Sequence, residues 1–128
     1  AKRSILLTGD IEEEIEHRLV KTYAGDLESD VLVVPHHGSK TSSSSAFLQK
    51  VKPRLAIATV GFRNRYGLPH PQVESRYQEL GIPFLRTDQT GAIQLKLAAQ
   101  PDLSFKQYRS QRLKVWHVPI WVDSVKVS

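Results

Sequence analysis

The residues of this chain that could do chemistry gather in one segment, where two adjacent histidines precede a glycine, a hydroxyl and an ammonium group. The segment spans residues 33–40 and reads VVPHHGSK. Two adjacent imidazoles offer no packing advantage over other polar residues, and neutral imidazole is the commonest nitrogen ligand of metals such as zinc. Adjacent residues of an extended segment point in opposite directions. We therefore expect one of His36 and His37 to bind a metal, and the other to orient it or to contact substrate.

The residues that follow the histidine pair suit a bound anion. Gly38 lets the backbone approach a ligand closely, and Ser39, Lys40 and Thr41 offer donors of the kind that hold phosphate oxygens. We predict a substrate-binding role for Ser39 and Lys40. A solvated surface lysine is the alternative for Lys40.

A carboxylate follows an earlier apolar run at residues 5–8. Asp10 and the acidic residues 12–14 match a helix N-cap with an acidic first turn, which the helix dipole favours. A carboxylate at the end of a buried strand is also a common position for a divalent metal. Both interpretations of Asp10 stay open at this level, because only its spatial partners separate them.

Length and composition point to one domain of ordinary globular type. The chain has 128 residues, no cysteine and a formal net charge of +5. The length suffices for a core without disulfides, and the lack of cysteine excludes disulfides and cysteine-rich zinc sites. No apolar run approaches the roughly 20 residues that span a bilayer, so we expect this piece to be soluble. The positive charge alone does not establish a polyanionic partner.

Apolar runs alternate with segments of helical periodicity, which is typical of packed sheet and helix layers. The expected strands are residues 5–8, 31–34, 55–60, 83–86 and 92–97, and the expected helices are 11–23, 46–52 and 71–80. The serines at 42–45 are expected to cap the second helix. The predicted fold class is α/β, with helices covering a mixed sheet in the order β-α-β-α-β-α-β-β.

We expect a packed unit over residues 1–98 and a basic, aromatic tail over residues 99–128. The tail carries Phe105, Lys106, Tyr108, Arg109, Arg112, Lys114, Trp116 and Trp121. A hairpin, a helix and a mobile arm all fit this pattern. His17 and His117 are interpreted as surface or packing histidines.

Four motifs occur together in an order and spacing that closely resemble the C-terminal part of the ComEC family, the channel proteins of natural DNA uptake. They are LLTGD at 6–10, VPHHGSKTS at 34–42, NRYG at 64–67 with PHP at 69–71, and LRTD with GAI between 85 and 93. The resemblance covers residues 4–97. The HHGSK and NRYG motifs are specific in combination, although either alone is weak. In that family this region has a metallo-β-lactamase fold, so the resemblance implies that the chain is its second half.

The resemblance implies a metal-dependent, nuclease-like hydrolase that acts on DNA phosphodiesters. Two divalent ions, zinc or manganese, would activate a water and stabilise both the attacking and the leaving oxygen. Asp10 matches the carboxylate that bridges the two ions, and His37, in preference to His36, matches the late histidine ligand. Asp10, His36 and His70 are the catalytic residues that we expect.

Partners and location also follow from the resemblance. Lys40, Asn64, Tyr66 and His70 would line the substrate side, with Arg63 or Arg65 countering phosphate charge. The expected partners are single-stranded or duplex DNA and the remainder of the membrane channel. The chain would be a soluble domain of an integral protein of the bacterial inner membrane.

Two departures from the family pattern modify these expectations. The HxHxDH motif that supplies most metal ligands of the fold is absent, so at most about two of the usual ligands remain where zinc sites need three or four. We therefore expect the isolated chain to be metal-poor and inactive. Relatives often have a histidine at the position of Leu68, which puts the role of His70 in question. A non-catalytic DNA-binding module and a structural docking domain are the alternative functions.

Half of a layered fold would leave one sheet face without its partner. Exposed apolar surface and open strand edges favour association. We therefore expect the chain to self-associate.

Overall fold

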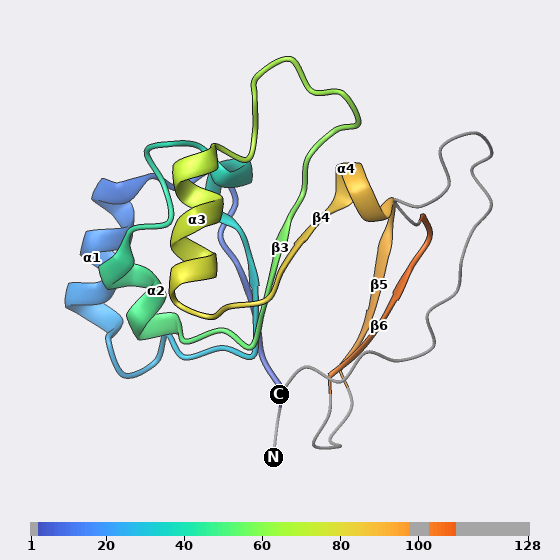
Figure 1. The fold of residues 1–128 in the computed structure, drawn as a ribbon. Coiled ribbons are helices and arrows are strands. Elements are labelled where there is room, and N and C mark those ends of the chain that lie inside the picture. The colour runs from blue at the N-terminus through green and yellow to red at the C-terminus, as the bar shows by residue number, and fades with distance from the viewer. Residues whose placement is uncertain (1–2, 98–102, 110–128) are drawn as a thin grey trace.

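A parallel sheet of four strands forms the centre of the molecule (Figure 1). The structure, a computed structural model, describes residues 3–97 and 103–109. The strands pair in chain order and are β1 (Ile5–Leu7), β2 (Val31–Val33), β3 (Leu55–Ala58) and β4 (Phe84–Arg86). The helices that connect them are α1 (Glu13–Tyr23), α2 (Ser45–Val51) and α3 (Pro71–Glu79), and they cover one face of the sheet. The predicted α/β class is confirmed.

The last two described strands form a separate antiparallel hairpin. They are β5 (Ile93–Lys96) and β6 (Ser104–Gln107). The strands are thus divided between two sheets, where the sequence predicted one mixed sheet. The physical reason lies after β4, where residues predicted as a turn form a short helix, α4 (Thr87–Thr90), that separates β5 from β4.

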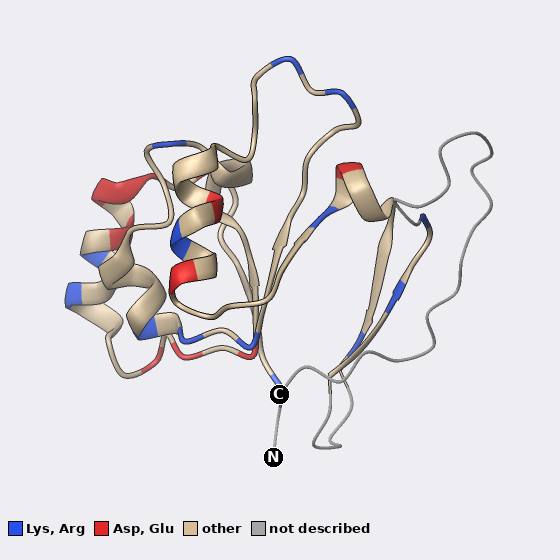
Figure 2. Cartoon of the chain, viewed as in Figure 1, with Lys and Arg blue, Asp and Glu red and all other residues tan. Residues whose placement is uncertain are grey.

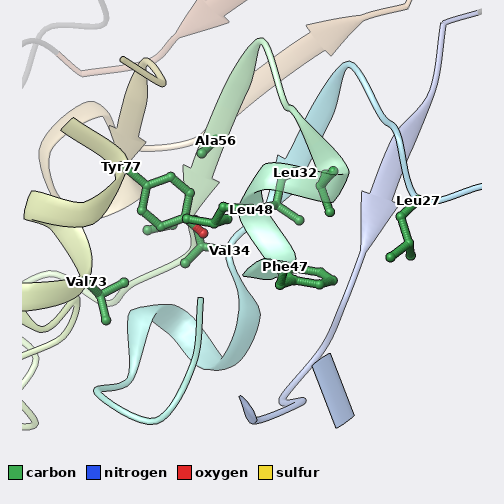
Figure 3. Packing of buried hydrophobic residues seen from close by; sticks show 10 residues of the cluster. Leu27, Leu32, Val34, Phe47, Leu48, Ala56, Val73 and Tyr77 are labelled. Carbon is green, nitrogen blue, oxygen red and sulfur yellow. The ribbon is translucent and has the colours of Figure 1, made fainter. Parts of the chain in front are cut away.

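The central strands are buried on both faces, as expected for parallel strands covered on both sides. Leu32, Ala56 and Ala58 face the helices and join the cluster in Figure 3, which includes Phe47 from α2 and Tyr77 from α3. The opposite face has its own cluster, formed by Val31, Leu55, Ile57, Leu103 and Phe105. The hairpin is therefore a third layer that packs on the sheet.

The edge strand β1 is less well covered than its neighbours. The side chain of Leu6 packs against the helix-side cluster. Ile5 and Leu7 alternate to the other face and are 38% and 71% exposed. Among residues 3–97 and 103–109, the hairpin-side cluster draws its sheet residues from β2, β3 and β4 and does not extend over β1.

Several local predictions have clear outcomes. Ser44 caps α2, since its hydroxyl accepts a hydrogen bond from the Phe47 N–H at 3.4 Å. His17 lies on the exposed surface of α1, with Nε2 3.8 Å from Oε1 of Glu13. Both predictions are confirmed.

The predicted tail contributes a strand at Ser104–Gln107, and the Phe105 side chain is only 3% exposed. Arg112, Lys114, Trp116, His117 and Trp121 lie outside the described residues.

Within residues 3–97 and 103–109, no helix combines the length and apolar character needed to cross a membrane.

Candidate functional site

Three loops that carry the predicted site residues meet at one edge of the parallel sheet. The carboxyl ends of parallel strands share an edge, and open α/β sheets bind their ligands there. Asp10 follows β1, the 3₁₀ segment η1 (Pro35–Gly38) follows β2, and residues 59–70 connect β3 to α3. The topology alone therefore brings these loops together.

The histidine pair lies in a left-handed turn, and the expectation of an extended segment is wrong. His36 has φ 46° and ψ 41°, His37 has φ 56° and ψ 20°, and Gly38 has φ 80°. Residues other than glycine seldom adopt this region, at a cost on the order of 1 kcal/mol each. The turn is held because the His36 N–H donates to the Gly9 carbonyl at 2.9 Å, and the Gly38 carbonyl accepts from the His70 N–H at 2.8 Å.

Close packing between two of these loops requires a glycine at position 38. A Cβ atom there would lie 2.5 Å from Cβ and 3.0 Å from Cα of Pro69. Real side chains do not approach this closely. Gly38 therefore fixes the distance between η1 and the loop that precedes α3.

Asp10 and His37 meet at this edge. Oδ1 of Asp10 lies 3.4 Å from Nε2 of His37. On the other side of the ring, Nδ1 lies 2.6 Å from the Thr59 carbonyl oxygen and 3.1 Å from the Thr59 hydroxyl. The helix-cap interpretation of Asp10 is wrong, because the N-cap residue of α1 is Glu12, whose side chain makes no capping hydrogen bond.

The contacts of His37 determine what its ring can do. A carbonyl oxygen only accepts hydrogen bonds, so Nδ1 carries the proton. In neutral His37, Nε2 then offers a lone pair toward Asp10, and metal-bound histidines commonly donate their other N–H to a backbone carbonyl in this way. A carboxylate oxygen and an imidazole nitrogen are suitable donors for zinc or manganese. Among the described residues, no third histidine, aspartate or glutamate completes a metal-binding group.

His36 belongs to a different contact. Its Nδ1 lies 3.2 Å from Oε1 of Glu12, although the orientation does not meet that of a hydrogen bond and the atom is buried. The same Glu12 oxygen accepts from the Thr41 hydroxyl at 3.1 Å, and Ser39 Oγ lies 3.3 Å from that hydroxyl. Two carboxylate–imidazole pairs therefore stand side by side along η1.

The sequence interpretation missed Glu12, because it counted this residue only within the acidic first turn of a helix. The signal available in the sequence was its position two residues after Asp10. Two adjacent histidines could each have a carboxylate partner from that segment.

Asn64 hydrogen-bonds to the backbone of its own loop, and Nδ1 of His70 hydrogen-bonds to the backbone of the helix that follows. The Asn64 side-chain amide donates to the Leu68 carbonyl at 2.8 Å, and its oxygen accepts from the Leu68 N–H at 2.9 Å. His70 is the N-cap of α3, where Nδ1 accepts from the Gln72 N–H at 3.2 Å. These contacts position the loop beside η1.

Lys40 and Tyr66 are free to meet a ligand at the surface. Lys40 is exposed next to η1. Tyr66 is 75% exposed, and the Arg65 guanidinium carbon lies 5.9 Å from its ring centroid. The predicted site residues thus divide into the Asp10–His37 pair, the His36 contact with Glu12, loop-forming Asn64 and His70, and exposed side chains.

Comparison with known proteins gives consistent relatives. No protein-family model matches the chain. It is 42% identical over 113 residues to "Competence protein ComA" of Neisseria gonorrhoeae, 43% over 93 residues to "ComE operon protein 3" of Bacillus subtilis, and 34% over 119 residues to "Recombination protein 2" of Haemophilus influenzae. These alignments cover 88%, 73% and 93% of the chain, respectively, but only 16%, 12% and 14% of the relatives. The chain therefore spans less than a fifth of their length.

Proposed function

Because the chain is homologous over most of its length to one segment of competence proteins, we propose that it is part of a protein of DNA uptake. In that protein it forms part of a metal-dependent, nuclease-like domain with a partial metallo-β-lactamase fold, which acts on DNA phosphodiesters. The parent is an integral protein of the bacterial inner membrane, and the rest of that channel is the chain's main protein partner. A non-catalytic DNA-binding or docking domain is the alternative.

The observation that carries this proposal is the Asp10–His37 pair. Its two donor atoms lie 3.4 Å apart, and the Thr59 carbonyl fixes the protonated nitrogen on the far side of the His37 ring. The two side chains are 46% and 69% exposed, for His37 and Asp10 respectively, so an ion from solvent can reach both donor atoms. The pair also stands at the sheet edge where ligands of parallel sheets bind.

In the proposed domain Asp10 and His37 hold divalent cations, zinc or manganese. When bound, such ions supply a water activated for attack and a clamp on the phosphodiester oxygens. Zinc sites need three or four protein ligands. We propose that the parent protein supplies those beyond Asp10 and His37.

The other residues of the edge bind substrate and handle protons. Oε1 of Glu12 lies 3.2 Å from Nδ1 of His36, and His36 gives or accepts a proton near the phosphodiester. Ser39 and Lys40 offer a hydroxyl and an ammonium group to phosphate oxygens, and Tyr66 contacts the nucleotide. Asn64 and His70 position this loop.

The direct test uses the longer parent protein, with manganese- or zinc-dependent cleavage of single-stranded and duplex DNA as the readout. Asp10→Asn and His37→Ala should each lower the cleavage rate by at least about a hundredfold, and should weaken Mn²⁺ binding followed by electron paramagnetic resonance. His17→Ala is the matched control, because this exposed histidine also pairs with a glutamate. Unchanged cleavage and Mn²⁺ binding in Asp10→Asn would refute the proposal.

The basic, aromatic loop beside the site favours the non-catalytic alternative, since Arg63, Arg65 and Tyr66 suit DNA without a metal. DNA binding by the parent that survives chelator and Asp10→Ala, with no cleavage under any divalent metal, would support that function. Loss of binding when residues 110–128 are removed would support it further, because that deletion leaves β6 and its buried Phe105 in place.

A further inference from the structure

An exposed aromatic ring has two arginine guanidinium groups near it, one from its own loop and one from a distant part of the chain. Phe62 belongs to the connection between β3 and α3 and is 57% exposed. The guanidinium carbons of Arg63 and Arg109 lie 5.2 Å and 5.0 Å from its ring centroid. Arg109 follows β6 and donates from Nη1 to the Asp88 carbonyl at 3.4 Å. The hairpin thus contributes a cation to a loop of the central sheet.

A second ring on the same loop has the same kind of partner. Tyr66 is 75% exposed, with the Arg65 guanidinium carbon 5.9 Å from its ring centroid. Residues 59–73 contain no aspartate or glutamate. In Figure 2 the charged stretches of this long loop, above the edge of the sheet, are all basic. We call Phe62, Arg63, Arg65, Tyr66 and Arg109 the aromatic–cation surface.

The composition of this surface identifies the chemistry of its ligand. Duplex DNA presents phosphates, while its bases are stacked in the helix, so cations alone would suffice for it. An unpaired strand presents bases as well, which stack on aromatic rings while arginines pair with the phosphates. Exposed rings interleaved with guanidinium groups match the second case.

We propose that the aromatic–cation surface binds single-stranded nucleic acid by stacking unpaired bases on Phe62 and Tyr66. The inference rests on the proposed function for the choice of DNA. It adds that this surface binds single-stranded DNA in preference to duplex DNA. Because most of this surface lies in the loop after β3, the bound nucleic acid would lie at the sheet edge that carries Asp10 and His37. Binding at this surface needs no metal.

The test measures fluorescence anisotropy of a labelled oligothymidylate and of a labelled duplex, with the full chain in EDTA at low salt. Phe62→Ala and Tyr66→Ala should each weaken binding of the single strand by about tenfold, with duplex affinity changed less than about twofold. Phe62→Trp should keep the affinity. Tyr23→Ala is the control, because Tyr23 is 53% exposed at the end of α1. Circular dichroism checks that each variant folds.

The cations should behave differently from the rings. Arg63→Gln should weaken the binding of both the single strand and the duplex, and should reduce the salt slope of binding by about one. Arg18→Gln on α1 should change neither the affinities nor the salt slope.

Three results would overturn the inference: equal loss of single-strand and duplex affinity in Phe62→Ala, wild-type affinity in both ring variants, and Phe62-dependent binding to anionic vesicles without binding to the oligonucleotide. Because EDTA removes the metal, each of these can occur while metal-dependent cleavage by the parent protein persists. Failure of cleavage with intact binding would instead refute only the hydrolase.

Discussion

At the scale of single residues, the backbone of η1 is what sets the site apart from ordinary loop structure. His36 and His37 both occupy left-handed backbone, with φ values of 46° and 56°. Strained residues other than glycine persist where the surroundings hold them, and they cluster at functional sites. Here the strain turns one ring toward Asp10 and the other toward Glu12. An extended backbone would separate the two rings by pointing them to opposite faces of the sheet.

At this scale, the sequence predicts the chemical type of the site better than it predicts which side chains contact one another. The types and order of Asp10, His36 and His37 indicated a metal or phosphate site at strand ends, and the structure places Asp10 against His37. The contact of His36 with Glu12 depends on a left-handed turn at two histidines, a conformation that sequence patterns do not signal because glycine and asparagine are its usual residues. The sequence also does not predict the hydrogen bonds of Asn64 to its own loop, because a polar loop residue can bond to a ligand or to the nearby backbone.

Gly38→Ala should lower the free energy of unfolding by at least about 2 kcal/mol, because the new Cβ would collide with Pro69 and the positive φ would be strained. Urea denaturation of the full chain measures this change. Gly9→Ala is the control: Gly9 has φ 58°, but a Cβ there would meet nothing within 4 Å, so the cost should stay near 1 kcal/mol. Equal losses in the two variants would show that η1 does not pack on Pro69 as described.

At the scale of elements, sequence patterns predict the positions of helices and strands that depend on local interactions. The helices and strands lie close to their predicted positions because apolar periodicity and proline or glycine boundaries fix them. β6 was not assigned, since its burial depends on the distant strands β2 and β3 that it helps to cover. Glu16 shows the same limit: a residue of an acidic helix is fully buried, and its carboxylate accepts from the Ser43 and Ser44 N–H groups at 2.6 Å and 2.8 Å.

Asp30 joins the N-terminal ends of several strands and gives the fold a pH dependence. Burial alone would raise the pKa of this carboxyl. The hydrogen bond from the Ser4 N–H and the neighbouring Arg3 and Arg54 outweigh burial and hold the pKa below its usual value. A depressed folded-state pKa stabilises the fold above the unfolded-state pKa of about 3.9. That stabilisation is lost as pH falls through the folded-state pKa.

Asp30→Asn should therefore remove part of the acid sensitivity. We expect the wild-type chain to lose more of its free energy of unfolding than the variant between pH 5 and the acid limit of the folded state. Urea denaturation at a series of pH values measures this difference. Asp26→Asn, at an exposed position after α1, is the control. Parallel pH profiles for wild type and Asp30→Asn would contradict the role given to the Arg3 contact.

At the scale of the whole molecule, the layers cover the sheet unevenly. Helices pack on one face, and the hairpin covers the other face over β2, β3 and β4. β1 stands at the edge of the sheet order, with Ile5 and Leu7 turned away from the helices. An edge strand that also exposes large apolar side chains invites pairing with another chain. The relatives are several times longer than this chain, so their additional residues are candidates to cover the same edge.

We therefore predict that the chain alone self-associates through β1 and that Leu7→Glu shifts it toward the monomer. A charge on a strand edge opposes edge-to-edge pairing, and Leu7 is 71% exposed, so the substitution should change the free energy of unfolding by less than about 0.5 kcal/mol. Sedimentation velocity over a range of concentrations measures the shift. Leu80→Glu is the matched control, because Leu80 is a 39% exposed leucine at the end of α3 and should leave association unchanged. A wild-type chain that sediments as a monomer at every concentration, or equal effects of the two substitutions, would show that the open edge is not what holds the copies together.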